Sequence, residues 1–284
     1  MEARHADAPQ EFARWVGRTR ITEDEAEPVP VRALAVTLDL PVPATRPGDP
    51  IPPAWHWLYF LAMSPGAALG LDGAEARGDF LPPVALPRRM WAGGSFVFHQ
   101  PIRLGERLCR VSTIRSVARK TGRQGELVFV TVGHEIAGSD GPAVSEEHVI
   151  VYRAAALPGA APPALDPPAD PVWRRVIVPD PVLLFRFSAL TFNGHRIHYD
   201  RAWATGTETY PGLVVHGPLQ AMLLLELVRA AVPERAVRRF DYRALAPIFD
   251  TGPFTVNGRP EGEGARIWTE DSAGNLAMTG EARF

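Results

Sequence analysis

The sequence has few of the features that mark secreted, membrane-bound or nucleic-acid-binding proteins. A single cysteine, Cys109, among 284 residues excludes an intramolecular disulfide and a cysteine metal cluster, which fits a reducing compartment. The formal net charge is only -2 at pH 7. Such a balance gives no electrostatic reason to expect nucleic acid or an acidic membrane as a partner.

No hydrophobic run is long enough to cross a membrane. The most apolar window, residues 219–232, contains Glu226 and Arg229 and falls short of the about 20 residues that a membrane-spanning helix needs. The N-terminal residues MEARHADAPQEF are polar and contain no apolar core of a signal peptide. We therefore expect a cytoplasmic protein with no membrane partner.

The length and composition are those of a core-forming globular protein. Hydrophobic residues make up 46% of the chain and charged residues 22%, and 284 residues are enough for two domains. The segment LPGAAPPALDPPADP, residues 157–171, is rich in proline and alanine and has no periodicity. We predict a linker there, between domains at 1–156 and 172–284.

The first half is predicted to combine helices with an antiparallel meander. Apolar patterns predict helices at residues 11–21 and 54–63 and a strand at 29–40. Further strand patterns separated by turn residues occupy residues 88–101, 107–117, 127–136 and 143–153.

The second half repeats this plan. An apolar helix at residues 219–232 precedes strand patterns at 237–245, 253–257, 265–270 and 275–284. The order Phe96-Val97-Phe98 followed by Pro101 is echoed by Phe240-Asp241-Tyr242 followed by Pro247. These repeats predict two copies of one α+β unit.

The most polar part of this plan immediately precedes the apolar helix. The segment SALTFNGHRIHYD, residues 188–200, is followed by YPGLVVHGPLQAMLL, residues 210–224. Together they resemble the hydratase segment of the MaoC-like dehydratases, and more narrowly the branch that hydrates mesaconyl-C4-CoA (3-methylfumaryl-CoA) or itaconyl-CoA. The stretch RRMWAGGSFVFHQPIRLGE, residues 88–106, is similar to the degenerate N-terminal unit of that branch.

The resemblance implies a double hotdog, in which two antiparallel sheets each wrap around a central helix and pack as a pseudo-dimer. It places the motif histidine on His198, the motif aspartate on Asn193 and the motif asparagine on His195. The glycine whose amide polarises the thioester carbonyl falls on Gly217. The aspartate is therefore missing from the matched position.

The implied chemistry is reversible hydration of a branched, carboxylated enoyl-CoA, with CoA as part of the substrate and no metal or other cofactor. Histidine titrates near neutrality and suits proton transfer, so we assign it to His198. Asn193 cannot act as a base and would hold the water, with His195 assisting. A helix that begins at Gly217-Pro218 leaves the Gly217 amide free to stabilise the enolate.

The remote carboxylate of such a substrate calls for an arginine. Arg196 replaces the motif proline and is the first candidate, with Arg88 and Arg89 as alternatives. Tyr199 and His216 complete the predicted substrate-binding set, and Asp200 is a second candidate for the missing carboxylate.

Plainer interpretations remain beside these assignments. His195 fits a structural histidine that caps a turn equally well, and His195, His198 and His216 lack the carboxylate or cysteine that would complete a metal site. Two other activities fit the same fold: a (3R)-hydroxyacyl thioester dehydratase of fatty-acid or polyketide metabolism and, less well, a thioesterase. A catalytically silent CoA-thioester-binding protein is a third alternative, and the sequence leaves open whether the chain forms a homodimer.

Overall fold

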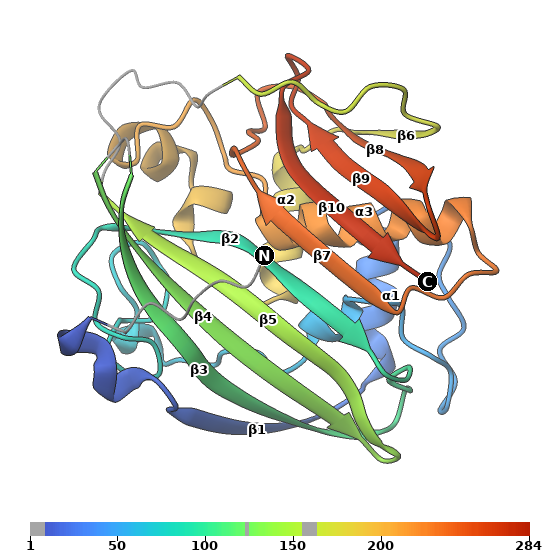
Figure 1. Cartoon of the computed structure of the whole chain (residues 1–284), viewed down its shortest axis with the longest axis horizontal. Coiled ribbons are helices and arrows are strands. Elements are labelled where there is room, and N and C mark those ends of the chain that lie inside the picture. Colours follow the sequence, from blue (N-terminus) through green and yellow to red (C-terminus); the bar gives the residue numbers. More distant parts are fainter. Residues whose placement is uncertain (1–8, 123–124, 155–163) are drawn as a thin grey trace.

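Ten antiparallel strands form one continuous, strongly curved sheet in the computed structural model, which describes residues 9–122, 125–154 and 164–284 (Figure 1). Across the sheet the strands follow the order β1-β3-β4-β5-β2-β7-β10-β9-β8-β6. The strands of the first half are β1 (Thr19–Glu25), β2 (Arg88–Phe98), β3 (Arg107–Gly122), β4 (Gly125–Gly138) and β5 (Gly141–Arg153). Those of the second half are β6 (Trp173–Ile177), β7 (Arg239–Ala244), β8 (Phe254–Glu261), β9 (Gly264–Glu270) and β10 (Leu276–Arg283).

The strand order shows that the two halves are copies of one unit. The same pattern runs outward from the centre on each side, so that β2 corresponds to β7 and β1 to β6. The two half-sheets join where β2 pairs with β7, and Phe96 lies directly opposite Phe240 in that register. The sequence echo between these residues therefore marks the pseudo-two-fold centre. The two sheets expected from the resemblance are joined edge to edge into one.

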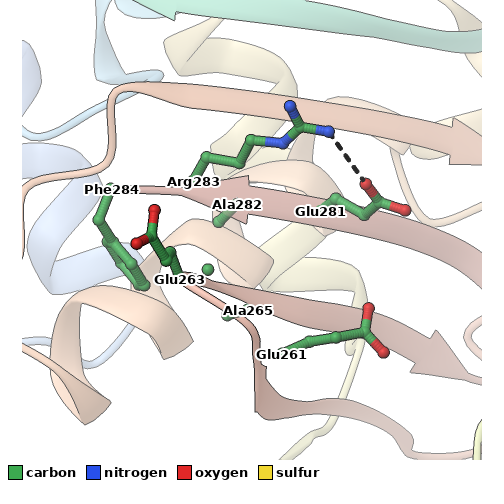
Figure 2. A pocket seen from close by; sticks show the side chains of 8 residues that line it. Glu261, Glu263, Ala265, Glu281, Ala282, Arg283 and Phe284 are labelled. Carbon is green, nitrogen blue, oxygen red and sulfur yellow. Dashed lines mark ion pairs between the residues drawn. The ribbon is translucent and has the colours of Figure 1, made fainter.

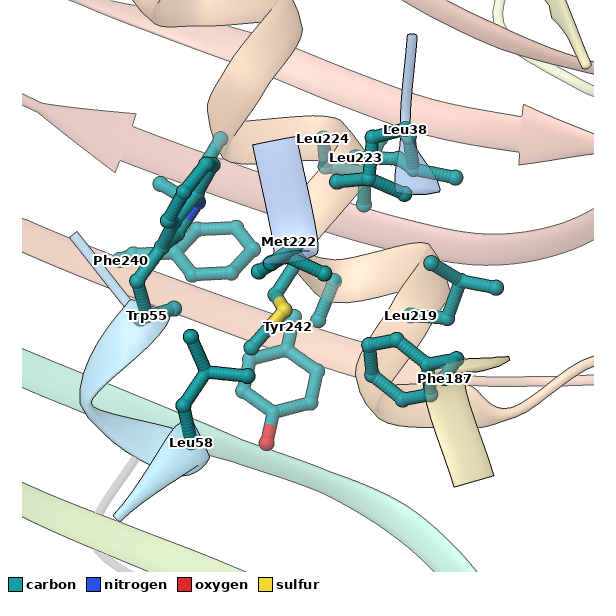
Figure 3. Close-up of a cluster of buried hydrophobic side chains, with 14 of the residues drawn as sticks. Leu38, Trp55, Leu58, Phe187, Leu219, Met222, Leu223, Leu224, Phe240 and Tyr242 are labelled. Atoms are coloured by element: carbon teal, nitrogen blue, oxygen red, sulfur yellow. The ribbon is translucent and has the colours of Figure 1, made fainter. Parts of the chain in front are cut away.

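Helix α3 (Gly217–Ala231) fills the concave side of the second half. Its residues from Leu219 to Val228 are all buried, which explains why the sequence is apolar nearly all round. The helix packs on the sheet and on elements of the first half, with Met222 near Trp55 and Tyr242 (Figure 3). The predicted helix at residues 219–232 is confirmed.

The described residues of the first half contain no comparable central helix, and the prediction of a helix at residues 54–63 is wrong. Only Trp55–Leu58 forms a 3₁₀ turn, flanked by left-handed residues at Ala54 (φ 66°) and Phe60 (φ 56°). The reason lies in a buried carboxylate on β5: Glu146 accepts hydrogen bonds from His56 (3.1 Å) and Trp57 (2.6 Å). A regular helix would not present both neighbouring side chains to one group.

A second wrong prediction concerns residues 29–40, which form helix α1 (Pro28–Thr37) and not a strand. The buried residues Val31, Leu34 and Ala35 follow helical spacing, and proline in the first turn suits a helix start. Helix α2 (Pro181–Leu190) holds the equivalent position in the second half and contacts α1. Neither α2 nor β6, which precedes it, was predicted.

Smaller differences concern the ends of the two halves. The predicted N-terminal helix at residues 11–21 is a 3₁₀ helix (Gln10–Trp15) followed by β1. Part of the predicted linker, 157–163, lies outside the described residues, and its remainder, 164–171, contains neither helix nor strand. The domain boundaries stay a prediction. Within the described part of the chain, no helix is long and apolar enough to span a membrane.

Candidate active site

The polar segment between α2 and α3 folds as a short loop whose 3₁₀ turn (Arg196–His198) lies against the start of α3. His216 is the N-cap residue of that helix, and its ring stacks on the His198 ring at 3.7 Å between centroids. The backbone amide of Val214 donates to the Ile197 carbonyl (2.9 Å) and ties the two segments together. The structure thus brings His198 and the N-terminus of α3 side by side.

His198 is held in one orientation and one tautomer. Its Nδ1 lies 2.7 Å from the Val214 carbonyl oxygen, which can only accept a hydrogen bond, so Nδ1 carries the proton and Nε2 has a free lone pair. Burial and the nearby His195 together lower the pKa of His198 to about 3, against the opposing effect of the Val214 bond. The side chain is neutral at pH 7 and ready to accept a proton.

The other two histidines extend the cluster. The His195 ring lies 5.6 Å from that of His198, edge to face, and burial lowers its pKa to about 4. His216 is completely buried, and its Nε2 lies 2.8 Å from the Ser188 hydroxyl. The pKa of His216 is also well below the ordinary value because of burial. The site therefore presents neutral imidazoles.

Gly217 begins α3 beside these rings. No acceptor for its N–H is found among the described residues, and Pro218 next to it has no N–H. A methyl group in place of its Cα hydrogen would lie 3.6 Å from Cβ of Trp91 on β2. A residue of the first half therefore lies next to Gly217. The geometry suits the predicted role of Gly217 as donor to a developing oxyanion.

The three candidate arginines differ in whether a carboxylate of the protein already pairs with them. The Arg196 guanidinium is bound to the Asp200 carboxylate at 2.7 and 3.0 Å and stacks on Trp203, so its charge is already used within the loop. This pairing disfavours both the first choice for the substrate carboxylate and Asp200 as the missing base. Hydrogen bonding from Trp203 and Arg196 holds the pKa of Asp200 below its ordinary value.

Arg88 and Arg89 point to opposite sides of β2 because they are neighbours in a strand. The Arg88 guanidinium pairs with Glu208 at 3.2 Å and lies over the Tyr210 ring. Arg89 lies on the same side as Trp91, and among the described residues no carboxylate pairs with it. Arg89 is thus the arginine with an uncommitted charge.

A recess of about 10 Å³, close to the volume of one water, opens beside this arginine. It is lined by Asp72, Pro87, Arg88, Arg89, His195, Ile197, Glu208 and Tyr210. Asp72 was not predicted, since it lies in an irregular segment far from the motif, and no sequence pattern distinguishes it. Its carboxylate lies 3.9 Å from Nε2 of His195.

Two predicted residues form hydrogen bonds within the loop. The Asn193 side chain accepts a hydrogen bond from the backbone of His195 (3.0 Å) and so stabilises the loop, while its amide nitrogen stays available. The Tyr199 hydroxyl donates to the Gly194 carbonyl (2.9 Å), and the ring is partly exposed. The catalytic role of Asn193 and the substrate-binding role of Tyr199 stay predictions.

A larger hollow of about 390 Å³ lies elsewhere, at the ends of β8, β9 and β10 (Figure 2). It is lined by Glu261, Glu263, Gly264, Ala265, Glu281, Ala282, Arg283 and Phe284. None of these is a predicted site residue, and three carboxylates would repel a CoA phosphate.

Comparison with known proteins agrees with this geometry. Residues 54–250 match the family model described as hydroxyacyl-thioester dehydratase type 2. The chain belongs to this family. It is 45% identical over 270 residues to the mesaconyl-C(4)-CoA hydratase of Chloroflexus aurantiacus, covering 95% of this chain and 96% of that protein.

Solved structures support the fold. A MaoC-like dehydratase superposes with a TM-score of 0.69 at 15% identity, covering 96% of this chain and 99% of that one. A Mycobacterium tuberculosis protein described as a double hotdog gives 0.59 at 12% identity, covering 97% and 98%. The double-hotdog prediction and the resemblance to the MaoC-like dehydratases are confirmed. The protein is an enzyme of the hydro-lyase class, so the silent binding protein is no longer an alternative.

Proposed function

We propose that this enzyme reversibly hydrates a branched, carboxylated enoyl-CoA such as mesaconyl-C4-CoA or itaconyl-CoA, giving a citramalyl-CoA-type product. The observation that carries the chemistry is the fixed tautomer of His198, with its free Nε2, beside the unpaired amide that opens α3. The identity of 45% to the mesaconyl-C(4)-CoA hydratase over nearly the whole chain favours the carboxylated substrate.

In the hydration direction, Nε2 of His198 takes a proton from water while the water oxygen forms a bond to the β-carbon. The electron pair of the double bond moves toward the thioester, and the Gly217 N–H stabilises the resulting enolate at the positive end of the α3 dipole. The His198 imidazolium then returns its proton to the α-carbon. The sum is the addition of one water, and Asn193 and His195 help to hold that water.

Arg89 is our choice for the remote carboxylate of the acyl group. It lies two residues from Trp91 on the same side of β2, and Trp91 contacts the start of α3. Arg89 lines the same recess as His195, and its positive charge lowers the pKa of that histidine. A guanidinium can bind a carboxylate through two parallel hydrogen bonds.

The decisive experiment compares Arg89→Gln with the wild-type enzyme on mesaconyl-C4-CoA, itaconyl-CoA and crotonyl-CoA. The absorbance of the conjugated thioester reports turnover. We expect KM for the carboxylated thioesters to rise at least about tenfold, the equivalent of losing one charge-assisted hydrogen bond. Turnover of crotonyl-CoA, which has no carboxylate, should change little.

Arg115→Gln is the matched control, since Arg115 is an exposed arginine on β3 that pairs with Glu135. An unchanged KM in Arg89→Gln would remove Arg89 from this role. A wild-type enzyme that hydrates crotonyl-CoA but neither carboxylated thioester would instead favour a (3R)-hydroxyacyl thioester dehydratase, the activity that gives the matched family its description.

We also propose that the reaction needs no metal or other cofactor, because protein side chains and one backbone amide account for every proton and charge. Turnover after dialysis against a chelator should equal that of the untreated enzyme. A loss that added Mg²⁺ or Zn²⁺ restores would contradict this part of the proposal.

A further inference from the structure

The motif loop is covered by a segment of the first half. Backbone N–H of Arg196 donates to the Asp72 carbonyl (2.8 Å), and the Arg196 side chain donates to the Leu71 carbonyl (3.2 Å). The contact is so close that a Cβ on Gly73 would lie 2.1 Å from the Gly194 carbonyl oxygen. The position of Asp72 relative to the motif is therefore set by backbone contacts and not by a flexible side chain.

Asp72 is held within this segment as well. Its Oδ1 accepts a hydrogen bond from the Ala74 backbone (3.0 Å), which leaves Oδ2 directed at Nε2 of His195, 3.9 Å away. That distance is too long for a direct hydrogen bond but short enough for the carboxylate charge to act on the His195 ring, most strongly when the ring is protonated. Both groups line the same recess.

A negative charge near His195 would stabilise the positive charge that develops in this site. His198 becomes an imidazolium during the reaction, beside two further imidazoles and Arg89. The motif position that carries aspartate in similar proteins holds the uncharged Asn193, and Asp200 is neutralised by Arg196. The remaining charged pair of the recess, Arg88 with Glu208, is internally balanced.

We propose that Asp72, contributed by the first half of the chain, is the carboxylate of this active site and acts as a positioning residue through His195. Its negative charge favours the Nε2–H tautomer of His195, which leaves Nδ1 to accept a hydrogen bond from the reacting water. Its charge stabilises the positive charge that builds up on the two imidazoles. This inference rests on the proposed hydration and adds the residue that replaces the motif aspartate.

Asp72→Asn tests this role because the amide oxygen can still accept the Ala74 hydrogen bond while the charge is lost. We expect kcat to fall at least about tenfold, the factor that corresponds to one pKa unit. The charge of Asp72 raises the pKa of His195, so its removal should lower that pKa. Glu75→Gln, in the same segment with its carboxylate on Ser64, is the control that should behave as wild type.

A double-mutant cycle with His195→Gln separates positioning from mere structure. If Asp72 acts through His195, adding Asp72→Asn to His195→Gln should cause little further loss of kcat. If Asp72→Asn lowers kcat as much in His195→Gln as it does in the wild-type enzyme, the proposal is overturned. If Asp72→Asn fails to fold, Asp72→Ser keeps an acceptor for the Ala74 amide without the charge and replaces it.

Imidazole ¹⁵N NMR tests the same contact without any assay, with the His195 signals assigned by their loss in His195→Gln. The wild-type protein should show the Nε2–H tautomer, and Asp72→Asn should lower the titration midpoint of His195. An Nδ1–H tautomer or an unshifted midpoint would overturn the inference about Asp72. Absent turnover of all carboxylated thioesters together with the expected NMR result would instead contradict only the proposed function.

Discussion

His198 shows how one backbone contact decides the chemistry of a side chain. The Val214 carbonyl fixes the proton on Nδ1, and the stack on His216 fixes the plane of the ring. The resemblance could single out His198, but it could not show which ring nitrogen lacks a proton. That follows from the contact with Val214, 16 positions further along the chain.

Replacing His198 by alanine should lower kcat by about 10²–10⁴-fold, the usual contribution of a general acid–base group, while the protein stays folded. The thioester absorbance assay measures the loss, and circular dichroism checks the fold. His99→Ala is the matched control because His99 is exposed and its side chain forms a hydrogen bond with Ser145, away from the motif loop. A kcat within a few-fold of wild type would exclude His198 from proton transfer.

At the scale of elements, the candidate active site is an assembly of both halves. The second half supplies the motif loop and α3, whereas the first half supplies β2 with Arg89 and Trp91 and the segment around Asp72. The first half can serve this site without a central helix of its own, because it contributes only β2 and the segment around Asp72 to the lining.

The contact between the two loops should depend on Gly73. Gly73 (φ 79°) and Gly78 (φ 97°) both have left-handed backbones, so alanine carries a similar conformational cost at each. A Cβ at Gly73 would collide with Gly194, whereas the nearest atom at Gly78 is 3.6 Å away. Gly73→Ala should therefore lower the free energy of unfolding by about 1–3 kcal/mol more than Gly78→Ala and also reduce kcat.

Urea unfolding of both glycine variants, together with the thioester assay, measures this difference. Equal costs and equal activities would show that the two loops can separate without consequence for the site.

At the scale of the whole molecule, the buried histidines make stability depend on pH. Burial lowers the pKa of His198 to about 3 and those of His195 and His148 to about 4, below the ordinary 6.5 of the unfolded chain. Between pH 6.5 and 4 the unfolded state binds protons that the folded state does not, so stability falls as the pH falls.

Glu146 adds to the same trend at lower pH. Its burial would raise its pKa, but hydrogen bonding and the charges of His148 and His56 outweigh burial and hold it at about 2. The stabilisation from this carboxylate is therefore present above its ordinary pKa of 4.5 and lost toward pH 2.

The free energy of unfolding, measured in urea between pH 7 and 4, should decrease by up to about 1.4 kcal/mol per pH unit for each proton taken up. In His198→Gln the slope should be shallower by up to one proton. His99→Gln should keep the wild-type slope because His99 is exposed. A pH-independent stability in this range, or an unchanged slope in His198→Gln, would contradict the burial of neutral histidines.

Local patterns in the sequence determined much of this protein. Alternating apolar residues predicted the central strands, the all-apolar run predicted α3, and the echo of Phe96 by Phe240 marked the internal repeat. The motif singled out His198 and Gly217 as candidate site residues. These features are local, since they depend on the period of the secondary structure or on short spacings, and tertiary packing reinforces them.

Only the tertiary structure decided the rest. Residues 54–63 do not form a regular helix because His56 and Trp57 bind Glu146 on a distant strand. Helix α1 forms where the alternating apolar pattern fitted a strand equally well. The same holds for the charges of the site: Arg196 is neutralised by Asp200, and Asp72 reaches His195 across 123 positions of chain. Which charges meet depends on the packing of the two halves, and no local pattern in the sequence contains that information.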